Sequence, residues 1–142
     1  MPAITKTTLT PYLFLNGKTK EAMSFYQRAI GGELHLTTFG EMQGEACPQA
    51  HRDLVMHASL KYGDFVLFGS DGNPNEPEDP ALLGAASIQL AIGAPEPELL
   101  RLFKTLSEGG QVIHALFDAP WGGKFGVLKD RYGFQWMFAS HS

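Results

Sequence analysis

Two similar stretches, AMSFYQRAIGG at residues 22–32 and LLRLFKTLSEGG at residues 99–110, decide the predicted fold. In each stretch apolar residues recur at positions i, i+3, i+4 and i+7, which is the spacing of an amphipathic helix. Each stretch ends in a Gly-Gly pair, and glycine readily adopts the left-handed backbone that closes a helix. We therefore expect one helix in each half of the chain, the first over residues 19–30. The apolar stripes are Ala22, Phe25, Tyr26, Ala29 and Ile30, and Leu99, Leu102, Phe103 and Leu106.

Strand-like segments surround both helices in the same order. One apolar segment precedes each helix, at residues 9–15 and 87–92, and another follows it, at residues 33–39 and 111–117. A Tyr-Gly pair, at residues 62–63 and again at 132–133, then indicates a tight turn between two further strands. The first half also carries a longer stretch, expected to be a loop, at residues 40–54. Each half therefore has the order strand, helix, strand, strand, strand, which we write βαβββ.

This repeat predicts an α+β fold in which two tandem βαβββ modules form one domain over residues 1–142. Module one covers about residues 8–69, the linker about 70–85 and module two about 86–140; the linker is rich in proline and acidic residues. A module of this size would be marginally stable alone, so the two should share a core. Together they are expected to form a curved mixed sheet with a concave cup, the kind of surface that binds small ligands.

Composition excludes several classes of function. The chain has 142 residues, a net charge of −4 and no cluster of basic residues, so neither nucleic acid nor an anionic membrane is an expected partner. Cys47 is the single cysteine, so no internal disulfide can form. The N-terminal sequence lacks the features of a signal peptide, and no apolar run reaches the ~18 residues of a membrane helix. We expect a cytoplasmic protein.

Four segments together resemble the PhnB-like group of the vicinal oxygen chelate superfamily, which includes glyoxalase I, extradiol dioxygenases and the bleomycin and fosfomycin resistance proteins. They are PYLFLNGKTKEAMSFYQRAIGGEL (residues 11–34), FGEM (39–42), HASLKYGD (57–64) and PWGGKFGVLKDRYGFQWMF (120–138). The resemblance implies tandem βαβββ modules, a homodimer and a divalent ion held by His and Glu side chains from four strands. Members of the group often carry the name 3-demethylubiquinone methyltransferase, but the sequence has no strand followed by a glycine-rich turn and a helix that could hold a methyl-donating nucleotide.

The residues at the expected metal positions are not metal ligands. Alignment of the two halves places these positions near Pro11, Leu67, Ser87 and Met137, and no neighbour within one residue is a histidine or a carboxylate. We therefore predict that the superfamily's usual metal site is absent, and we expect no cofactor. Another group, Glu41, Glu45, Cys47, His51 and His57, does not have the spacing of a structural zinc site.

His57 and Glu41 are the candidate catalytic residues. His57 interrupts the apolar pattern of its strand, so it either faces the cup as an acid–base or ligand-contacting group or is an interior histidine with a structural partner. Glu41, in the FGEM segment, is either directed into the cup near His57 or is a solvated loop acid. Asp130 is expected to cap the turn that follows it.

Five further residues are predicted to contact a ligand. Gln89 and Gln135 should lie on the concave side of their strands, where a buried amide bonds either a ligand or a protein group. Trp121 and Phe125 are either walls of the pocket or core residues. Met137 lies at one of the expected metal positions. Trp136, Phe25 and Phe103 are assigned to the core.

The sequence has no motif for a serine or cysteine nucleophile and no phosphate-binding loop. The first hypothesis is a protein that binds a small organic molecule in an apolar cup without metal. The alternative is a lyase, isomerase or dioxygenase-type enzyme of the same superfamily that uses His57 with Glu41 or an atypical divalent metal site.

Overall fold

The computed structural model describes residues 9–72 and 89–140, and the described elements follow the predicted repeat. Module one contains β1 (Tyr12–Phe14), α1 (Thr19–Ile30), β2 (Glu33–Thr38), β3 (Val55–Tyr62) and β4 (Phe65–Ser70). Module two contains β5 (Gln89–Gly93), α3 (Glu96–Ser107), β6 (Gln111–Asp118), β7 (Lys124–Lys129) and β8 (Gln135–Ala139). The first helix has the predicted bounds, whereas β1 is shorter than the predicted strand at residues 9–15. Ser70, placed in the linker by the sequence, ends β4, and most of that linker lies outside the described residues.

Residues 40–54, expected to form a loop, contain helical turns instead. They are α2 (Phe39–Gln43) and two short 3₁₀ segments, η1 (Gly44–Ala46) and η2 (Gln49–His51). The start of α2 is a capping box, in which the Glu41 backbone N–H donates to the Thr38 hydroxyl oxygen over 3.1 Å and the Glu41 side chain accepts from the Thr38 backbone N–H. Its sequence signature, Thr38 followed three residues later by Glu41, is visible in the sequence and could have predicted this helix.

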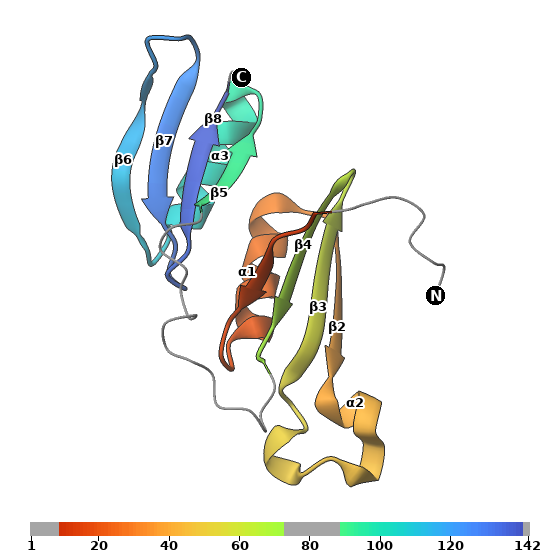
Figure 1. The fold of residues 1–142 in the computed structure, drawn as a ribbon. Helices are drawn as coiled ribbons and strands as arrows, with labels where there is room; N and C mark the ends of the chain where they lie inside the picture. The colour runs from red at the N-terminus through yellow and green to blue at the C-terminus, as the bar shows by residue number, and fades with distance from the viewer. Residues whose placement is uncertain (1–8, 73–88, 141–142) are drawn as a thin grey trace.

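Both modules have the same sheet topology. The strand orders are β1-β4-β3-β2 and β5-β8-β7-β6, and the first strand of each module pairs in parallel with the last. The two modules lie side by side, with β2 and β6 at the outer edges (Figure 1). The predicted internal repeat is thereby confirmed at the level of strand order and direction.

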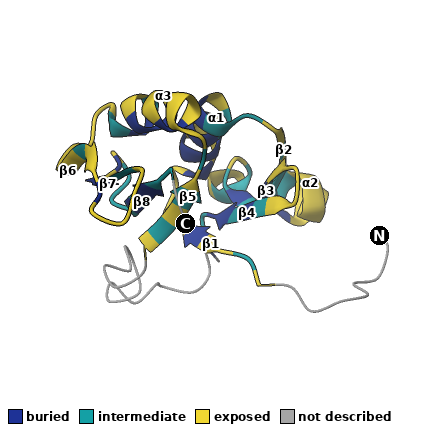
Figure 2. Cartoon of the chain, turned by 90° about the horizontal axis from the view of Figure 1, so that it is seen from above, coloured by how far each residue is buried: buried dark blue, intermediate teal, exposed yellow. Residues whose placement is uncertain are grey.

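Each helix covers one face of its own sheet. The stripe residues Ala22, Phe25, Tyr26 and Ala29 of α1 are buried, as are Leu99, Leu102, Phe103 and Leu106 of α3. One apolar cluster contains buried residues of both modules, so the two share a core as expected. Seen from above, α1 and α3 lie on the same side of the two sheets (Figure 2). The opposite side of each sheet, which we call its open face, has no described helix packed on it.

A buried carboxylate joins the two modules. The side chain of Asp130, which is 3% exposed, lies in the turn after β7. One oxygen accepts hydrogen bonds from the Tyr26 hydroxyl and the Trp136 indole N–H, each with a donor–acceptor distance of 2.7 Å. The other accepts from the backbone N–H groups of Tyr132 and Phe134, over 2.8 and 3.1 Å. The predicted turn cap is confirmed, and the same carboxylate also binds the helix of the other module.

This environment acts on Tyr26 as well. Burial, together with the neighbouring Asp130 carboxylate, raises the pKa of the Tyr26 phenol far above its ordinary value. The phenol therefore stays protonated and donates a hydrogen bond to the carboxylate, which satisfies both buried groups.

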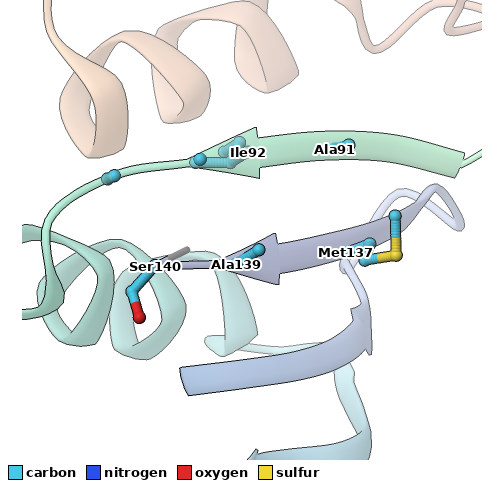
Figure 3. Close-up of a pocket in the computed structure, with 7 residues that line it drawn as sticks. Ala91, Ile92, Met137, Ala139 and Ser140 are labelled. Atoms are coloured by element: carbon cyan, nitrogen blue, oxygen red, sulfur yellow. The ribbon is translucent and has the colours of Figure 1, made fainter. Parts of the chain in front are cut away.

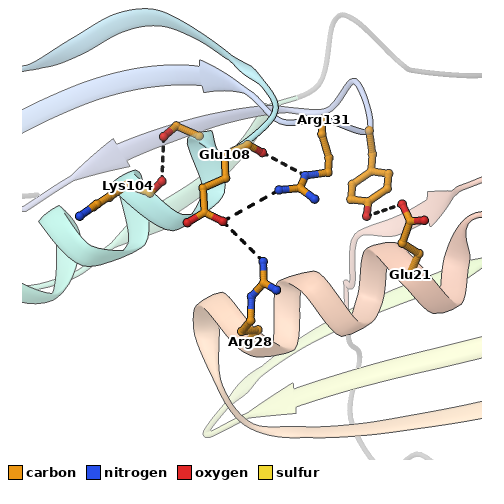
Figure 4. Close-up of polar contacts among 7 residues, drawn as sticks. Glu21, Arg28, Lys104, Glu108 and Arg131 are labelled. Atoms are coloured by element: carbon orange, nitrogen blue, oxygen red, sulfur yellow. Dashed lines mark hydrogen bonds and ion pairs between the residues drawn. The ribbon is translucent and has the colours of Figure 1, made fainter.

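Exposed polar contacts surround this junction (Figure 4). The Glu108 carboxylate lies 3.5 Å from the Arg28 guanidinium of α1 and 3.9 Å from that of Arg131. The Tyr132 hydroxyl donates to Glu21 over 2.8 Å, and its burial and this bond raise the pKa of Tyr132 to about 12. Exposed ion pairs contribute little to stability, so the buried Asp130 contacts account for more of the junction.

None of the helices described here has the length and apolar character needed to cross a membrane.

Removal of the Tyr26 hydroxyl should weaken the junction measurably. Tyr26→Phe deletes one buried hydrogen bond to a carboxylate, and we expect it to lower the free energy of unfolding by about 2 kcal/mol. Urea unfolding followed by tryptophan fluorescence measures this difference. The matched control is Tyr132→Phe, which deletes an exposed hydrogen bond and should cost less than about 0.5 kcal/mol. Equal losses in the two variants would contradict the assignment of Asp130 as the main contact between modules.

Candidate functional site

On the open face of the second sheet lie the residues that alternate with core residues along each strand. Trp136 and Phe138 of β8 are buried in the core, where Trp136 packs on Tyr26 of α1 and Phe138 on Phe103 of α3. Gln135, Met137 and Ala139 therefore project from the other side. The register places Gln89 opposite Gln135, Ala91 opposite Met137 and Gly93 opposite Ala139. The sequence analysis expected Gln89 and Gln135 on one side of the sheet, and the structure places them there as neighbours.

A pocket of about 480 Å³ lies on this face (Figure 3). Its lining includes Ala91, Ile92, Met137, Ala139 and Ser140 from β5 and from β8 and the residue after it. Ala91, Met137 and Ala139 present apolar side chains to the pocket, and Ser140 adds a hydroxyl. Ile92 alternates with Ala91 along β5, and its side chain packs against the core. Of the residues predicted to contact a ligand, Met137 lines this pocket, whereas Gln89 and Gln135 lie farther along the same strands.

Three aromatic rings continue this face next to the pocket. Phe125 of β7 is paired with Ala139, a pocket residue. The Phe125 ring lies edge to face with Trp121, centroids 5.5 Å apart, and with Phe117, centroids 5.8 Å apart. Trp121 is 60% exposed, so it is not a core residue, whereas Phe125 is half-buried. These rings provide a large apolar contact area beside the pocket.

The open face of the first sheet carries a second cluster, built around His57. Tyr12 of β1 is paired with Phe68 of β4, and His57 lies on the adjacent strand β3. The Tyr12 hydroxyl oxygen lies 3.0 Å from His57 Nδ1, within hydrogen-bond distance. The His57 ring is 4.8 Å from that of Phe68, and the Tyr12 ring stacks on Phe14 at 5.6 Å. We call Tyr12, Phe14, His57 and Phe68 the histidine cluster.

Glu41 has different neighbours from those that the sequence analysis considered. Its carboxylate accepts a hydrogen bond from the Thr38 hydroxyl over 3.1 Å and is part of the capping box of α2. Its side chain is exposed. Among the described residues, Tyr12 is the side chain within hydrogen-bond distance of His57, and Glu41 contributes to the local helix.

The side chains in these strands do not fit the superfamily's divalent ion. Leu67, one of the positions aligned with a metal ligand, is 1% exposed and faces the core, while its neighbour Phe68 lies on the open face. On β1 the aligned ligand position is near Pro11, and its neighbour Tyr12, which pairs with Phe68, lies on the open face. Over residues 9–72 and 89–140, no three or more His, Cys, Asp or Glu side chains come together as a group that could hold a metal ion. Ser87 lies outside the described residues. We derive no chemistry through such an ion.

The sequence analysis selected His57 but not the three aromatic members of the histidine cluster. Tyr12, the hydrogen-bond partner of His57, entered it only as a neighbour of an expected metal position. The alternation of Tyr12, Leu13 and Phe14, with a buried leucine between two exposed rings, is the signal that could have identified it. Its contact with His57 joins residues that are 45 positions apart, and that distance in sequence hides the pairing.

The comparisons with known proteins agree with this architecture. Residues 7–139 match the protein family described as 3-demethylubiquinone-9 3-methyltransferase. The chain belongs to this family. It is 33% identical to protein PA1353 from Pseudomonas aeruginosa. The match to the crystal structure of that protein covers 96% of this chain and 98% of that chain, with a TM-score of 0.82.

Two further solved structures have a similar fold. The PhnB protein from Bacillus cereus is 25% identical, with a TM-score of 0.72 over 95% of this chain and 100% of its own. A glyoxalase-related enzyme from Fulvimarina pelagi shares the fold at 17% identity, with a TM-score of 0.52 over 96% of this chain and 88% of its own. The predicted PhnB-like assignment is confirmed, and the chain shares its fold with a glyoxalase-related enzyme.

The activity in the family's description has no visible counterpart in the strand-to-helix turns of this chain. A nucleotide is typically held at a glycine-rich turn that opens a helix of a parallel sheet. The β1–α1 turn contains a single glycine, Gly17, and the β5–α3 turn is Ala94-Pro95. Family membership therefore indicates the fold of this chain, whereas its function depends on the residues of the site.

Proposed function

We propose that this protein binds a small organic molecule in an apolar cup formed by the open faces of its sheets, without the superfamily's usual metal. The pocket around Met137 carries the proposal, because it combines a volume of about 480 Å³ with a lining of alanine, isoleucine and methionine. Phe125 and Trp121 border it with aromatic surface. Pockets of this composition usually hold small ligands by apolar contact.

The proposed unit is a homodimer. The two open faces of one chain lie side by side rather than opposite each other (Figure 2). Large apolar side chains are exposed on them, including Tyr12 at 43%, Phe14 at 46% and Phe117 at 41%. A second copy that covers these faces would remove this apolar surface from water and enclose the cup. Light scattering on the purified protein measures its molar mass and therefore its oligomeric state. The cytoplasmic location stays a prediction from the sequence.

Filling the pocket should reduce the binding of an apolar probe. Ala139→Leu adds a larger side chain to the pocket lining without touching the core. We expect it to weaken binding of 1-anilinonaphthalene-8-sulfonate, measured by fluorescence, by about tenfold, because lost apolar contact of ~1.4 kcal/mol corresponds to that factor. Ala50→Leu makes the same change at an exposed position of η2, and its binding should match the parent protein. Equal affinities in both variants would exclude this pocket as the site.

The metal-free character of the cup is tested by elemental analysis. Protein purified without added metal should contain no stoichiometric transition metal, because the strands offer neither imidazole nor carboxylate ligands at the usual positions. Calorimetric titration with nickel, zinc, manganese and iron(II) should show no tight binding. A stoichiometric ion would contradict the proposal and would direct attention to His57, Glu41, Cys47 and His51.

A second candidate function is an enzyme of the same superfamily that uses His57 for acid–base catalysis. The observation that favours it is the histidine cluster, in which a tyrosine orients an imidazole on the open face. In this enzyme hypothesis the hydrogen-bond partner of His57 is Tyr12, so Glu41 is not required.

His57→Ala separates the two functions. In a protein that only binds, this change should weaken binding of the sulfonate probe by no more than about tenfold, the factor for one hydrogen bond. In an acid–base enzyme it should lower the rate by about 10² to 10⁴. Glyoxalase and extradiol dioxygenase assays on the parent protein and the variant provide the rates. A parent protein without turnover in these assays favours the binding function.

A further inference from the structure

The histidine cluster gives more information about the ligand than the apolar pocket does. From its geometry we infer that Tyr12 is a positioning residue that fixes the tautomer of His57, so that Nε2–H is presented to an oxygen atom of a flat aromatic ligand. This inference rests on the proposed binding function and names the class of ligand. The apolar pocket sets the size of a ligand, whereas the cluster would set its polar group.

The tautomer follows from the contact between Tyr12 and His57. The Tyr12 hydroxyl oxygen and His57 Nδ1 are 3.0 Å apart. A phenol is a better hydrogen-bond donor than a neutral imidazole N–H, and an unprotonated imidazole nitrogen is a better acceptor than a phenol oxygen. Tyr12 O–H therefore donates to Nδ1, and the ring proton of the neutral imidazole lies on Nε2.

The Nε2 atom is available to a ligand. Among the described residues no group makes a hydrogen bond with it. In the same part of the chain, no buried side-chain nitrogen or oxygen lacks a partner. Within the part of the chain that the structure describes, the half-buried His57 therefore leaves Nε2 exposed, because a buried, unpaired Nε2 would be an unsatisfied group.

The neighbours of His57 define the rest of the ligand. Phe68 lies edge to face with the imidazole, and Tyr12 and Phe14 extend the aromatic surface along β1. Such a surface favours stacking with a planar ring. A donor N–H at its border selects a carboxylate, carbonyl or phenolic oxygen and disfavours an ammonium group, which can only donate. The expected ligand is therefore a planar ring that carries an oxygen acceptor.

The tautomer can be measured on the ligand-free protein. Long-range ¹H–¹⁵N correlation spectra at about pH 9, where histidine side chains are neutral, distinguish protonated from unprotonated ring nitrogens. His57→Gln identifies the His57 signals among those of the five histidines. We expect the proton on Nε2 in the parent protein and a mixture of both tautomers in Tyr12→Phe, which keeps the ring but lacks the hydroxyl.

Tyr62→Phe is the matched control, because Tyr62 is an exposed tyrosine at the end of β3. Its spectrum should equal that of the parent protein, and circular dichroism verifies that each variant is folded. A proton on Nδ1 in the parent protein, or an unchanged tautomer in Tyr12→Phe, would overturn the positioning role whether or not any ligand binds.

The ligand class is tested with two probes of similar size and opposite polar groups, benzoate and benzylammonium. Benzoate should shift the His57 Nε2–H signal, and Tyr12→Phe should weaken its binding by about twofold, because only part of a mixed tautomer population presents Nε2–H. Benzylammonium should leave that signal unchanged. Equal shifts with both probes, or no shift with benzoate, would refute the oxygen-acceptor ligand. A benzoate shift of the Met137 methyl signal without any response at His57 would refute this inference and leave the apolar binding function intact.

Discussion

The Asp130 carboxylate is the contact on which the arrangement of the two modules depends. A buried charge is costly unless hydrogen bonds replace its hydration, and here four donors do so. The donors come from α1 of module one, from β8 and from the turn that Asp130 itself begins. Because a carboxylate accepts within a narrow geometry, this set fixes the position of Tyr26 relative to Trp136. Apolar packing between α1 and module two is less directional and would allow more than one arrangement.

The position of this contact determines where the functional surface lies. Asp130 joins the modules on the side of the helices, so both sheets turn their other faces outward (Figure 2). A second carboxylate, Asp71, holds module one together in a similar way. It accepts from the backbone N–H groups of Gly17 and Thr19 at the start of α1, over 2.7 and 3.0 Å, and from Val55 N–H of β3, over 2.8 Å. In residues 9–72 and 89–140, both of these carboxylates bind the helix that covers the sheet of module one.

The sequence predicted those features that depend on local periodicity. The helix stripes, the repeat of strand order and the turn cap at Asp130 each follow from residues close together in the chain. The contacts of Asp130 with Tyr26 and of Tyr12 with His57 could not be predicted, since they depend on how distant segments pack. The faces of short strands were equally hard to assign. A shift of one residue exchanges the two faces, and the sequence alignment selected Leu67 where Phe68 lies on the open face. A capping box at Thr38 was present in the sequence and was not used.

The two halves keep the same core pattern but differ in their open faces. Paired parallel strands present Tyr12 opposite Phe68 in the first sheet and Ala91 opposite Met137 in the second. The core positions must fill similar spaces beneath similar helices, so packing restricts both halves alike. No such requirement acts on the open faces, and a duplicated fold can therefore carry two unlike surfaces. One surface offers aromatic rings and an imidazole, the other small apolar side chains and a methionine.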